Sequence, residues 1–455
     1  MLPSTAFLKD RLAQVVPCMA AQGHEVAGLQ TELERLPDSY DALAAFADRL
    51  ARLPLRADWA YVEPGDLDSI WAECDPARPR GPITELEPND ASLRARSAFY
   101  AAVTGCMLGK PLECNPTLDE IRAAAEPIGE WPLSDYVTVR LLDKLGRRHG
   151  SWQTTTRGNV RFVTPDDDIN YLIIGMLMIE GHGSDWTQEH LRRAWLRNLP
   201  PLMTHGPERT FLARASVASM GASMGVSKNT GDPSKEALTL HREWAHVFNP
   251  KDEACGAAIR VDAYGYACAG SPELAAAMAW RDASMTHNRT GIYGSMYVAA
   301  AIAAAFVVDD PLDAFRIALQ FVPQRSRFHE IVADCLSMVE AADDWMAGYR
   351  AINGAYGEYG HCKVYQESGH LINSAKFARS TGEALCLQVM QGCDTDCYGE
   401  IIGSIMGAYF GPGYLDRKWI APFEDRLHTG LAQFHEQSLS RVADRMAALP
   451  GIMTT

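Results

Sequence analysis

The segment Cys393–Gly411, with the sequence CDTDCYGEIIGSIMGAYFG, restricts the fold more than any other part of the chain. Its glycines Gly399, Gly403, Gly407 and Gly411 recur every four residues, so on a helix they share one face. Glycine in a helix interior costs roughly 1 kcal/mol relative to alanine. That cost is offset when a glycine face lets a second element approach closely. The segment therefore predicts a helix that is packed deep in the protein.

Two carboxylates stand at the start of this predicted helix. Asp394 and Asp396 are two residues apart, so within a helix their side chains would point away from each other. In the turn before a helix, both can converge on a single point. We therefore expect both carboxylates at the buried N-terminal end of the helix, facing groups from elsewhere in the chain.

Composition and charge set the broad class of the protein. The chain has 455 residues, of which 47% are hydrophobic, enough for one large domain or two or three smaller ones. A formal net charge of −15 argues against nonspecific binding to nucleic acid. The longest apolar run, Met296–Val308, is too short to span a bilayer. We expect a chain that binds neither nucleic acid nor membrane.

The cysteines and the N-terminus indicate the compartment. The 11 cysteines are odd in number and include no CxxC pair, which argues against a disulfide framework. Asp10 and Arg11 lie where a signal peptide would need an apolar run. These features predict a cytoplasmic protein.

The chain reads as helical from end to end. Residues 1–60 alternate apolar and charged positions at helical spacing, and 61–90 are rich in proline, aspartate and glycine. We therefore expect an N-terminal helical extension with its connector over 1–95. An all-α domain, a large orthogonal helical bundle, follows over 96–430. A C-terminal helix within 431–455 is expected to pack on it.

A second group of carboxylates lies in VRFVTPDDDINYLIIGMLMIEG. Thr164 suits an N-cap, Pro165 suits the first helical position, and aspartates suit the first turn, so an ordinary helix start is one interpretation. However, Tyr171–Ile179 is apolar nearly all round, which indicates a buried helix. The aspartates Asp166–Asp168 at its mouth would then repel each other and lose solvation. A divalent cation would relieve both costs, and both interpretations stay open.

The two helix starts together contribute five aspartates. Oxygen ligands suit Mg²⁺, Mn²⁺ or Ca²⁺ rather than Zn²⁺. With so many carboxylates, two ions a few ångströms apart are plausible. The chain contains no HExxH or P-loop motif that would compete for the chemistry.

Three further positions have an ordinary interpretation when taken alone. Glu113 follows the turn after a small-residue helix, where a surface carboxylate is the common case. His287 lies in the polar loop THNRTG, where a structural histidine is the common case. Gly256 opens a small-residue run in which backbone could approach a ligand.

Five motifs, in order, give the chain a family resemblance. They are GCMLGKPLE, TPDDDINY, GAAIR, MTHNRTGIYG and CDTDCYGEIIGSIMGA. Over roughly 95–430 the chain resembles the ADP-ribosylglycohydrolase family, which includes the dinitrogenase reductase-activating glycohydrolases. The resemblance implies an all-α fold with a binuclear Mg²⁺ centre, or Mn²⁺ as an alternative, at the bottom of a cleft. The expected reaction is hydrolysis of an N- or O-glycosidic bond at the anomeric carbon of a ribose.

The resemblance also implies roles for individual residues. Asp166 and Asp167 match the first pair of metal-binding aspartates and also belong, with Glu113, to the implied catalytic group. Asp394 and Asp396 match the second metal-binding pair. The implied substrate contacts are Gly256, His287, Asn288, Gly291, Tyr293 and Gly294.

The chain departs from the family pattern at three single positions and in its ligand loop, where Cys255 stands before Gly256. Pro165 stands where the family has threonine or serine, and Asp168 replaces a threonine and can supply a further carboxylate. Cys397 replaces the terminal Thr/Ser ligand, and a thiol is a poor partner for Mg²⁺. We include Asp168 and Cys397 among the predicted metal ligands.

The predicted substrate is an ADP-ribosyl group on a protein or a small acceptor. One alternative is an N-riboside hydrolase that acts on a nucleoside-like metabolite. Another is a catalytically silent protein that binds ADP-ribose.

Overall fold

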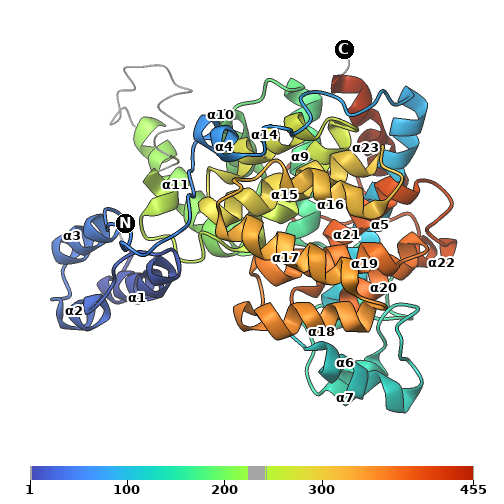
Figure 1. Ribbon diagram of the computed structural model, residues 1–455, viewed down its shortest axis with the longest axis horizontal. Helices are drawn as coiled ribbons and strands as arrows, with labels where there is room; N and C mark the ends of the chain where they lie inside the picture. Colours follow the sequence, from blue (N-terminus) through green and yellow to red (C-terminus); the bar gives the residue numbers. More distant parts are fainter. Residues whose placement is uncertain (1–2, 224–240, 242, 454–455) are drawn as a thin grey trace.

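The structure is a computed structural model, and it describes residues 3–223, 241 and 243–453. In those ranges all regular structure is helical, and the only β-type pairings are isolated bridges. The all-α prediction is therefore confirmed (Figure 1). Within the same ranges, no helix combines the length and the apolar character that crossing a membrane requires.

The N-terminal helices form a small unit with its own core. They are α1 (Thr5–Ala21), α2 (Leu29–Arg35) and α3 (Tyr40–Leu50). Helix α3 buries Leu43 and Phe46 on one face, as its amphipathic sequence predicts. The unit lies at one side of the molecule, as the blue helices of Figure 1 show.

The connector after this unit is fixed to the main body. It contains α4 (Leu67–Glu73), and its backbone is bonded at several points to the helical domain. The Val62 N–H donates to the carbonyl of Arg325, and the Tyr293 hydroxyl donates to the carbonyl of Pro64 at 2.6 Å. The proline-rich connector is therefore extended and is held against the helical domain by these hydrogen bonds.

Buried helices form the centre of the main body. They are α5 (Pro88–Gly109), α9 (Asp167–His182), α15 (Arg289–Ala305) and α21 (Thr395–Phe410), and each buries most of its residues. The surrounding helices are α6 (Leu118–Ala125), α7 (Val139–Leu145), α8 (Trp152–Thr155), α10 (Gln188–Asn198), α11 (Gly206–Ser223), α13 (Asp262–Ala267), α14 (Pro272–Ala283), α16 (Pro311–Leu319), α17 (Arg327–Ala341), α18 (Trp345–Tyr356), α19 (Val364–Phe377), α20 (Thr381–Met390), α22 (Arg417–Ile420) and α23 (Leu439–Met453). Short 3₁₀ turns include η1 (Lys110–Leu112) and η4 (Cys255–Arg260).

The glycine face of α21 packs directly on the backbone of α5, so the predicted close approach is confirmed. A Cβ atom on Gly403 would lie 2.4 Å from the carbonyl oxygen of Ala101. A Cβ atom on Gly105 of α5 would lie 1.9 Å from the carbonyl oxygen of Gly399. Gly411 differs from the rest of the row, because it ends the helix with φ +72°. The contact places the C-terminal end of α5 against the first turn of α21.

The start of α9 differs from the sequence expectation. The N-cap is Asp166 and not Thr164, and the helix begins at Asp167, so Pro165 lies outside it. Asp166 has an extended backbone (φ −147°, ψ 155°), and its carboxylate accepts a hydrogen bond from the Asp168 N–H at 3.2 Å. Aspartate caps a helix at least as well as threonine. This cap helps to hold the Asp166 carboxylate inside the protein.

Candidate metal centre

Three helix ends meet at the centre of the main body. The C-terminal end of α5 continues through η1 to Glu113, α9 starts after Asp166, and α21 starts after Asp394. The α5–α21 contact and the buried α9 therefore bring together both aspartate groups and Glu113. This is the convergence on which the predicted metal centre depends.

Lys110 joins the carboxylates and was not among the predicted site residues. Its Nζ atom lies 2.6 Å from Glu113 Oε2, 2.7 Å from Asp166 Oδ2 and 2.7 Å from Asp396 Oδ2. Lys110 is itself buried, and a buried ammonium group needs such partners. The sequence signal was available in GCMLGKPLE, where Lys110 stands three residues before Glu113.

Burial and nearby charges shift the pKa values of Glu113 and Asp396, two acidic groups beside Lys110, in opposite directions. Burial and the charge of Asp396 raise the pKa of Glu113 to about 8, against the opposing effect of Lys110. Burial also disfavours an ionised Asp396, but Lys110 outweighs it and brings the pKa of Asp396 down to about 2. Near neutral pH, Glu113 therefore holds a proton while Asp396 is charged.

Asp168 and Asp396 have free coordination capacity. Asp168 Oδ1 and Asp396 Oδ1 are buried and have no hydrogen-bond partner among the described residues. Ligand atoms of Asp168, Asp396 and Cys397 all lie within 4.8 Å of one another, and so do those of Cys106, Asp166 and Asp168. An unpartnered buried carboxylate is costly, and a cation would satisfy it. The residues present therefore fit at least one metal ion.

Asp167 and Asp394 take different positions from the other aspartates. Asp167 is only half-buried, and in the described part of the chain it joins no three-residue cluster of ligand atoms. Burial and the charge of Asp166 raise the pKa of Asp167 well above its ordinary value. Asp394 turns toward two thiols, with Cys255 Sγ at 3.1 Å and Cys362 Sγ at 3.3 Å from its Oδ2.

The predicted substrate contacts lie on η4 and at the start of α15. Several already have structural partners. The Asn288 amide donates to Asp252 Oδ2 at 2.9 Å, and the Tyr293 hydroxyl donates to the carbonyl of Pro64. Gly294 packs against Val364, where an added Cβ would lie 3.1 Å from a side-chain carbon. Their role in binding a substrate stays a prediction.

His287 is buried and keeps one ring nitrogen available. Its Nδ1 lies 2.8 Å from Thr286 Oγ1, and no described group bonds to its Nε2. Gly291 stands beside the ring, since a Cβ there would lie 2.8 Å from His287 Cδ2. Gly256 stands beside a carboxylate, since a Cβ there would lie 2.7 Å from Glu208 Oε1.

A buried ion network around Arg260, the last residue of η4, was not predicted. Arg260 pairs with Glu208 and with Asp282 Oδ1, the latter at 2.6 Å. Burial raises the pKa of Glu208 to about 7, although Arg260 acts in the opposite direction. Because the partners are far apart in the sequence, nothing in the chain pattern pointed to this network.

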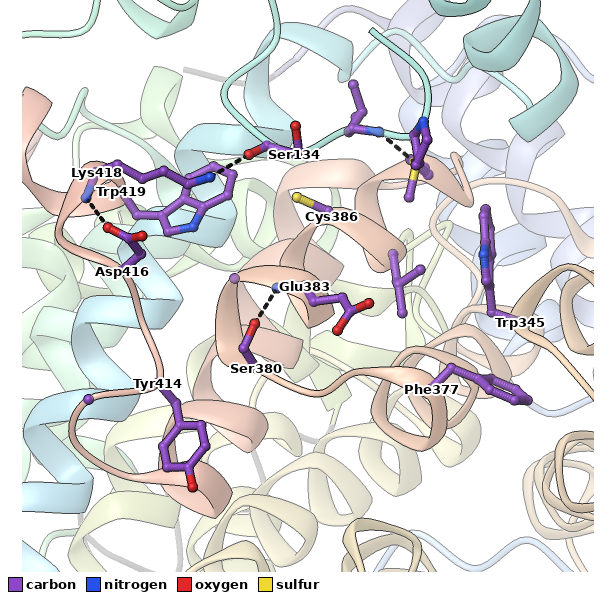
Figure 2. Close-up of a pocket in the computed structure, with 16 residues that line it drawn as sticks. Ser134, Trp345, Phe377, Ser380, Glu383, Cys386, Tyr414, Asp416, Lys418 and Trp419 are labelled. Atoms are coloured by element: carbon purple, nitrogen blue, oxygen red, sulfur yellow. Dashed lines mark hydrogen bonds between the residues drawn. The ribbon is translucent and has the colours of Figure 1, made fainter.

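A pocket of 780 Å³ opens elsewhere on the molecule. Its wall carries the aromatic residues Trp345, Phe377, Tyr414 and Trp419 around the first turns of α20, with Glu383 among them (Figure 2). The lining residues are distinct from the carboxylates described above. The pocket is therefore separate from the candidate metal centre.

Comparison with known proteins decides the family. The sequence profile described as "ADP-ribosylglycohydrolase" matches residues 87–450. The chain belongs to the ADP-ribosylglycohydrolase family. Membership in this family supports glycohydrolase chemistry, and the clusters of aspartate, cysteine and histidine are candidate sites for its metal.

Solved structures and curated sequences add two facts about this chain. A solved structure described as "ADP-ribosylglycohydrolase-related protein complex" is 18% identical, with a TM-score of 0.48, and the match covers 80% of this chain and 99% of that chain. No curated protein sequence matches this chain.

Proposed function

We propose that the protein is a metal-dependent hydrolase that cleaves the glycosidic bond at the anomeric carbon of a ribose. The proposed substrate is an ADP-ribosyl group on a protein or a small acceptor. One observation carries the proposal in this member of the family. Buried, unpartnered oxygens of Asp168 and Asp396 lie where three helix ends of the described chain meet, and Lys110 joins Asp396 to Glu113 there.

The proposed metal ligands follow from the donor atoms. Asp166, Asp168 and Asp396 supply carboxylate oxygens, and Cys397 shares a cluster of ligand atoms with Asp168 and Asp396. Asp394, two residues before Asp396, stays a proposed ligand. Oxygen donors favour Mg²⁺, with Mn²⁺ as the alternative, and we propose two ions as the family resemblance implies. When bound, such ions polarise a water molecule and orient ribose hydroxyls. Asp167, which is half-buried at the start of α9, stays a proposed ligand.

Glu113 is the proposed acid and base. It holds a proton near neutral pH, as a group that protonates a leaving atom must. His149 Nε2 lies 3.6 Å from Glu113 Oε2 and offers a path by which the proton can be exchanged with the protein surface. The surrounding carboxylates stabilise positive charge that develops on the ribose. Asp166 and Asp167 are the alternative bases.

The variant Asp396→Asn tests the function. We expect it to lose at least about 100-fold in kcat, because one oxygen donor to the metal and the partner of Lys110 are both changed. Binding of Mg²⁺, followed by calorimetry, should weaken in the same variant. Asp48→Asn on the exposed face of α3 is the control and should keep both properties. Full activity and unchanged Mg²⁺ affinity in Asp396→Asn would rule out the proposal.

A substrate panel separates the alternatives. ADP-ribosyl-arginine, ADP-ribosyl-serine and simple nucleosides are compared under the same conditions. Cleavage of nucleosides alone would favour the small-metabolite hydrolase. Tight binding of ADP-ribose without any turnover would favour the silent binding protein. The cytoplasmic location stays a prediction.

A further inference from the structure

Two cysteines from distant parts of the chain place their thiols side by side. Cys255 Sγ and Cys362 Sγ lie 3.1 Å and 3.3 Å from the same oxygen, Asp394 Oδ2. The two sulfur atoms are themselves within 4.8 Å of each other. Both residues are free thiols in the structure. A short movement of the side chains therefore separates this pair of sulfurs from a disulfide, whose S–S bond is about 2.05 Å long.

The backbone holds the two cysteines opposite each other. Ala254 and Lys363 form an isolated antiparallel bridge, and the Cys255 N–H donates to the carbonyl of Cys362 at 3.3 Å. Residues directly opposite in an antiparallel pair have Cα atoms about 4.5–5.5 Å apart and side chains on the same face. A disulfide needs a Cα separation of about 4.4–6.8 Å. The two segments can therefore be cross-linked with little movement of the backbone.

Cys362 is the thiol that a small oxidant reaches first. It is partly exposed, whereas Cys255 is buried. Cys362 also has φ +58°, a conformation that residues other than glycine rarely adopt and that the surrounding contacts have to hold. Its position beside Cys255 is thus fixed by the fold. One accessible thiol with a second thiol within reach is the arrangement that a reversible oxidation site requires.

We propose that Cys362 and Cys255 are an oxidative modification site and form a reversible disulfide when the protein meets hydrogen peroxide. Cys362 Sγ attacks one peroxide oxygen, the O–O bond breaks and water leaves, which gives a sulfenic acid. Cys255 Sγ then attacks Cys362 Sγ, the S–O bond breaks and a second water leaves. For each disulfide, two thiols are oxidised and one H₂O₂ is reduced to two molecules of water.

The disulfide changes the surroundings of the proposed metal centre. It removes both S–H donors from Asp394 Oδ2 and ties the first residue of η4 to the loop before α19. Asp394 is the N-cap of α21 and stays a proposed metal ligand, so the modification lies beside that centre and adds no ion to it. The disulfide depends on the positions of the thiols and can form whether or not the protein is the proposed hydrolase.

Oxidation of the full-length protein tests the site. Reduced protein is freed of reductant, treated with H₂O₂ in the presence of EDTA, blocked with N-ethylmaleimide and digested without reduction. Mass spectrometry should find the peptides of Cys255 and Cys362 joined, and dithiothreitol should separate them again. Maleimide on both cysteines after the peroxide treatment would overturn the proposal. So would a disulfide that joins either of them to Cys397.

Variants assign the two steps. In Cys255→Ser the sulfenic acid on Cys362 has no thiol to condense with, so dimedone should label Cys362 at least about tenfold more than in the unchanged protein. Cys18→Ser in α1, partly exposed like Cys362, is the matched control and should keep the full yield of the disulfide. Equal labelling of Cys362 with and without Cys255 would overturn the assignment.

The mass-spectrometric result on the unchanged protein stands even where a variant fails to fold. Hydrolase activity enters none of these measurements, so the modification site and the proposed function can fail independently.

Discussion

Lys110 shows how one residue can set the charge of the whole centre. Its ammonium group lies among Glu113, Asp166 and Asp396, a place that a divalent cation could also occupy. A buried lysine with three carboxylate partners stabilises them, while it also competes with metal for the same oxygens. Lys110 therefore couples metal affinity to the stability of the protein without metal.

The variant Lys110→Met separates these two effects. Without metal, we expect it to be less stable by roughly 3–5 kcal/mol, because buried carboxylates lose their counter-charge. Its affinity for Mg²⁺ should rise, so Mg²⁺ should raise its Tm more than that of the unchanged protein. Thermal unfolding with and without Mg²⁺ measures both. The control is the exposed Lys144→Met in α7. A variant with unchanged or weaker Mg²⁺ affinity would show that Lys110 does not compete with metal.

The variant Glu113→Gln tests the proton that this residue holds. A glutamine keeps the shape but cannot transfer a proton, so kcat should fall by about 10²–10⁴. Mg²⁺ binding by calorimetry should change little, because Glu113 is assigned to proton transfer. The exposed Glu34→Gln in α2 should leave kcat unchanged. A Glu113→Gln enzyme with full kcat would remove Glu113 from the mechanism.

At the scale of elements, the contact between α5 and α21 positions the site. Backbone touches backbone along Gly105, Gly399 and Gly403, so neither helix can shift without separating the pair. Each helix ends or begins at a site residue, since Lys110 follows α5 and Asp394 caps α21. A change in their packing should therefore reach the metal centre.

The variant Gly403→Ala introduces a Cβ that would lie 2.4 Å from the carbonyl oxygen of Ala101. We expect a loss of roughly 1–3 kcal/mol in the free energy of unfolding, from urea titrations, together with weaker Mg²⁺ binding. Gly354→Ala in α18 is the control, because none of the described atoms lies within 4 Å of its added Cβ. That change should be neutral or stabilise by about 0.4–1 kcal/mol. Equal stability of the two variants would contradict the close-packing account.

At the scale of the whole molecule, the N-terminal unit is bonded to the loop that leads to the metal centre. The Gln22 amide donates to Asp252 Oδ1 at 2.8 Å, and the Asn288 amide donates to Asp252 Oδ2. Arg327 donates to the carbonyl of Ala21 at 2.9 Å and pairs with Glu253. The unit therefore braces the segment just before Cys255.

The pH dependence of stability reports on this brace. Burial and the charge of Glu253 raise the pKa of Asp252 to about 7 in the folded protein, above about 3.9 in an unfolded chain. The folded state thus binds the proton more tightly. Its contribution to stability is complete below about pH 4 and is lost as the pH rises to 7.

The variant Asp252→Asn cannot titrate at this position. Between about pH 4 and 7, the unfolding free energy of the unchanged protein should therefore fall by roughly 1–3 kcal/mol relative to that of the variant. Urea titrations at several pH values measure the difference. Parallel pH profiles of the two proteins would show that Asp252 has no raised pKa.

Short-range patterns in the sequence determined the all-α class, the glycine face of α21 and the two aspartate groups at helix starts. These features depend on the spacing of residues within single helices, which the sequence contains directly. The predicted start of α9 was wrong, since the sequence pattern pointed to Thr164 as the N-cap and the folded backbone uses Asp166 instead. The family motifs predicted that Glu113 is a site residue, whereas its own sequence context indicated a surface residue.

Only the tertiary structure decided which groups surround each carboxylate. Lys110 reaches Asp166 and Asp396 because the ends of α5, α9 and α21 meet. No pattern in the sequence indicates that these three helix ends lie together. The thiols of Cys255 and Cys362 reach Asp394 from separate loops, more than 100 residues apart, that pair through their backbones. Spacing along a helix is a local property, whereas the charge and the donor atoms at a buried site are set by segments that folding brings together.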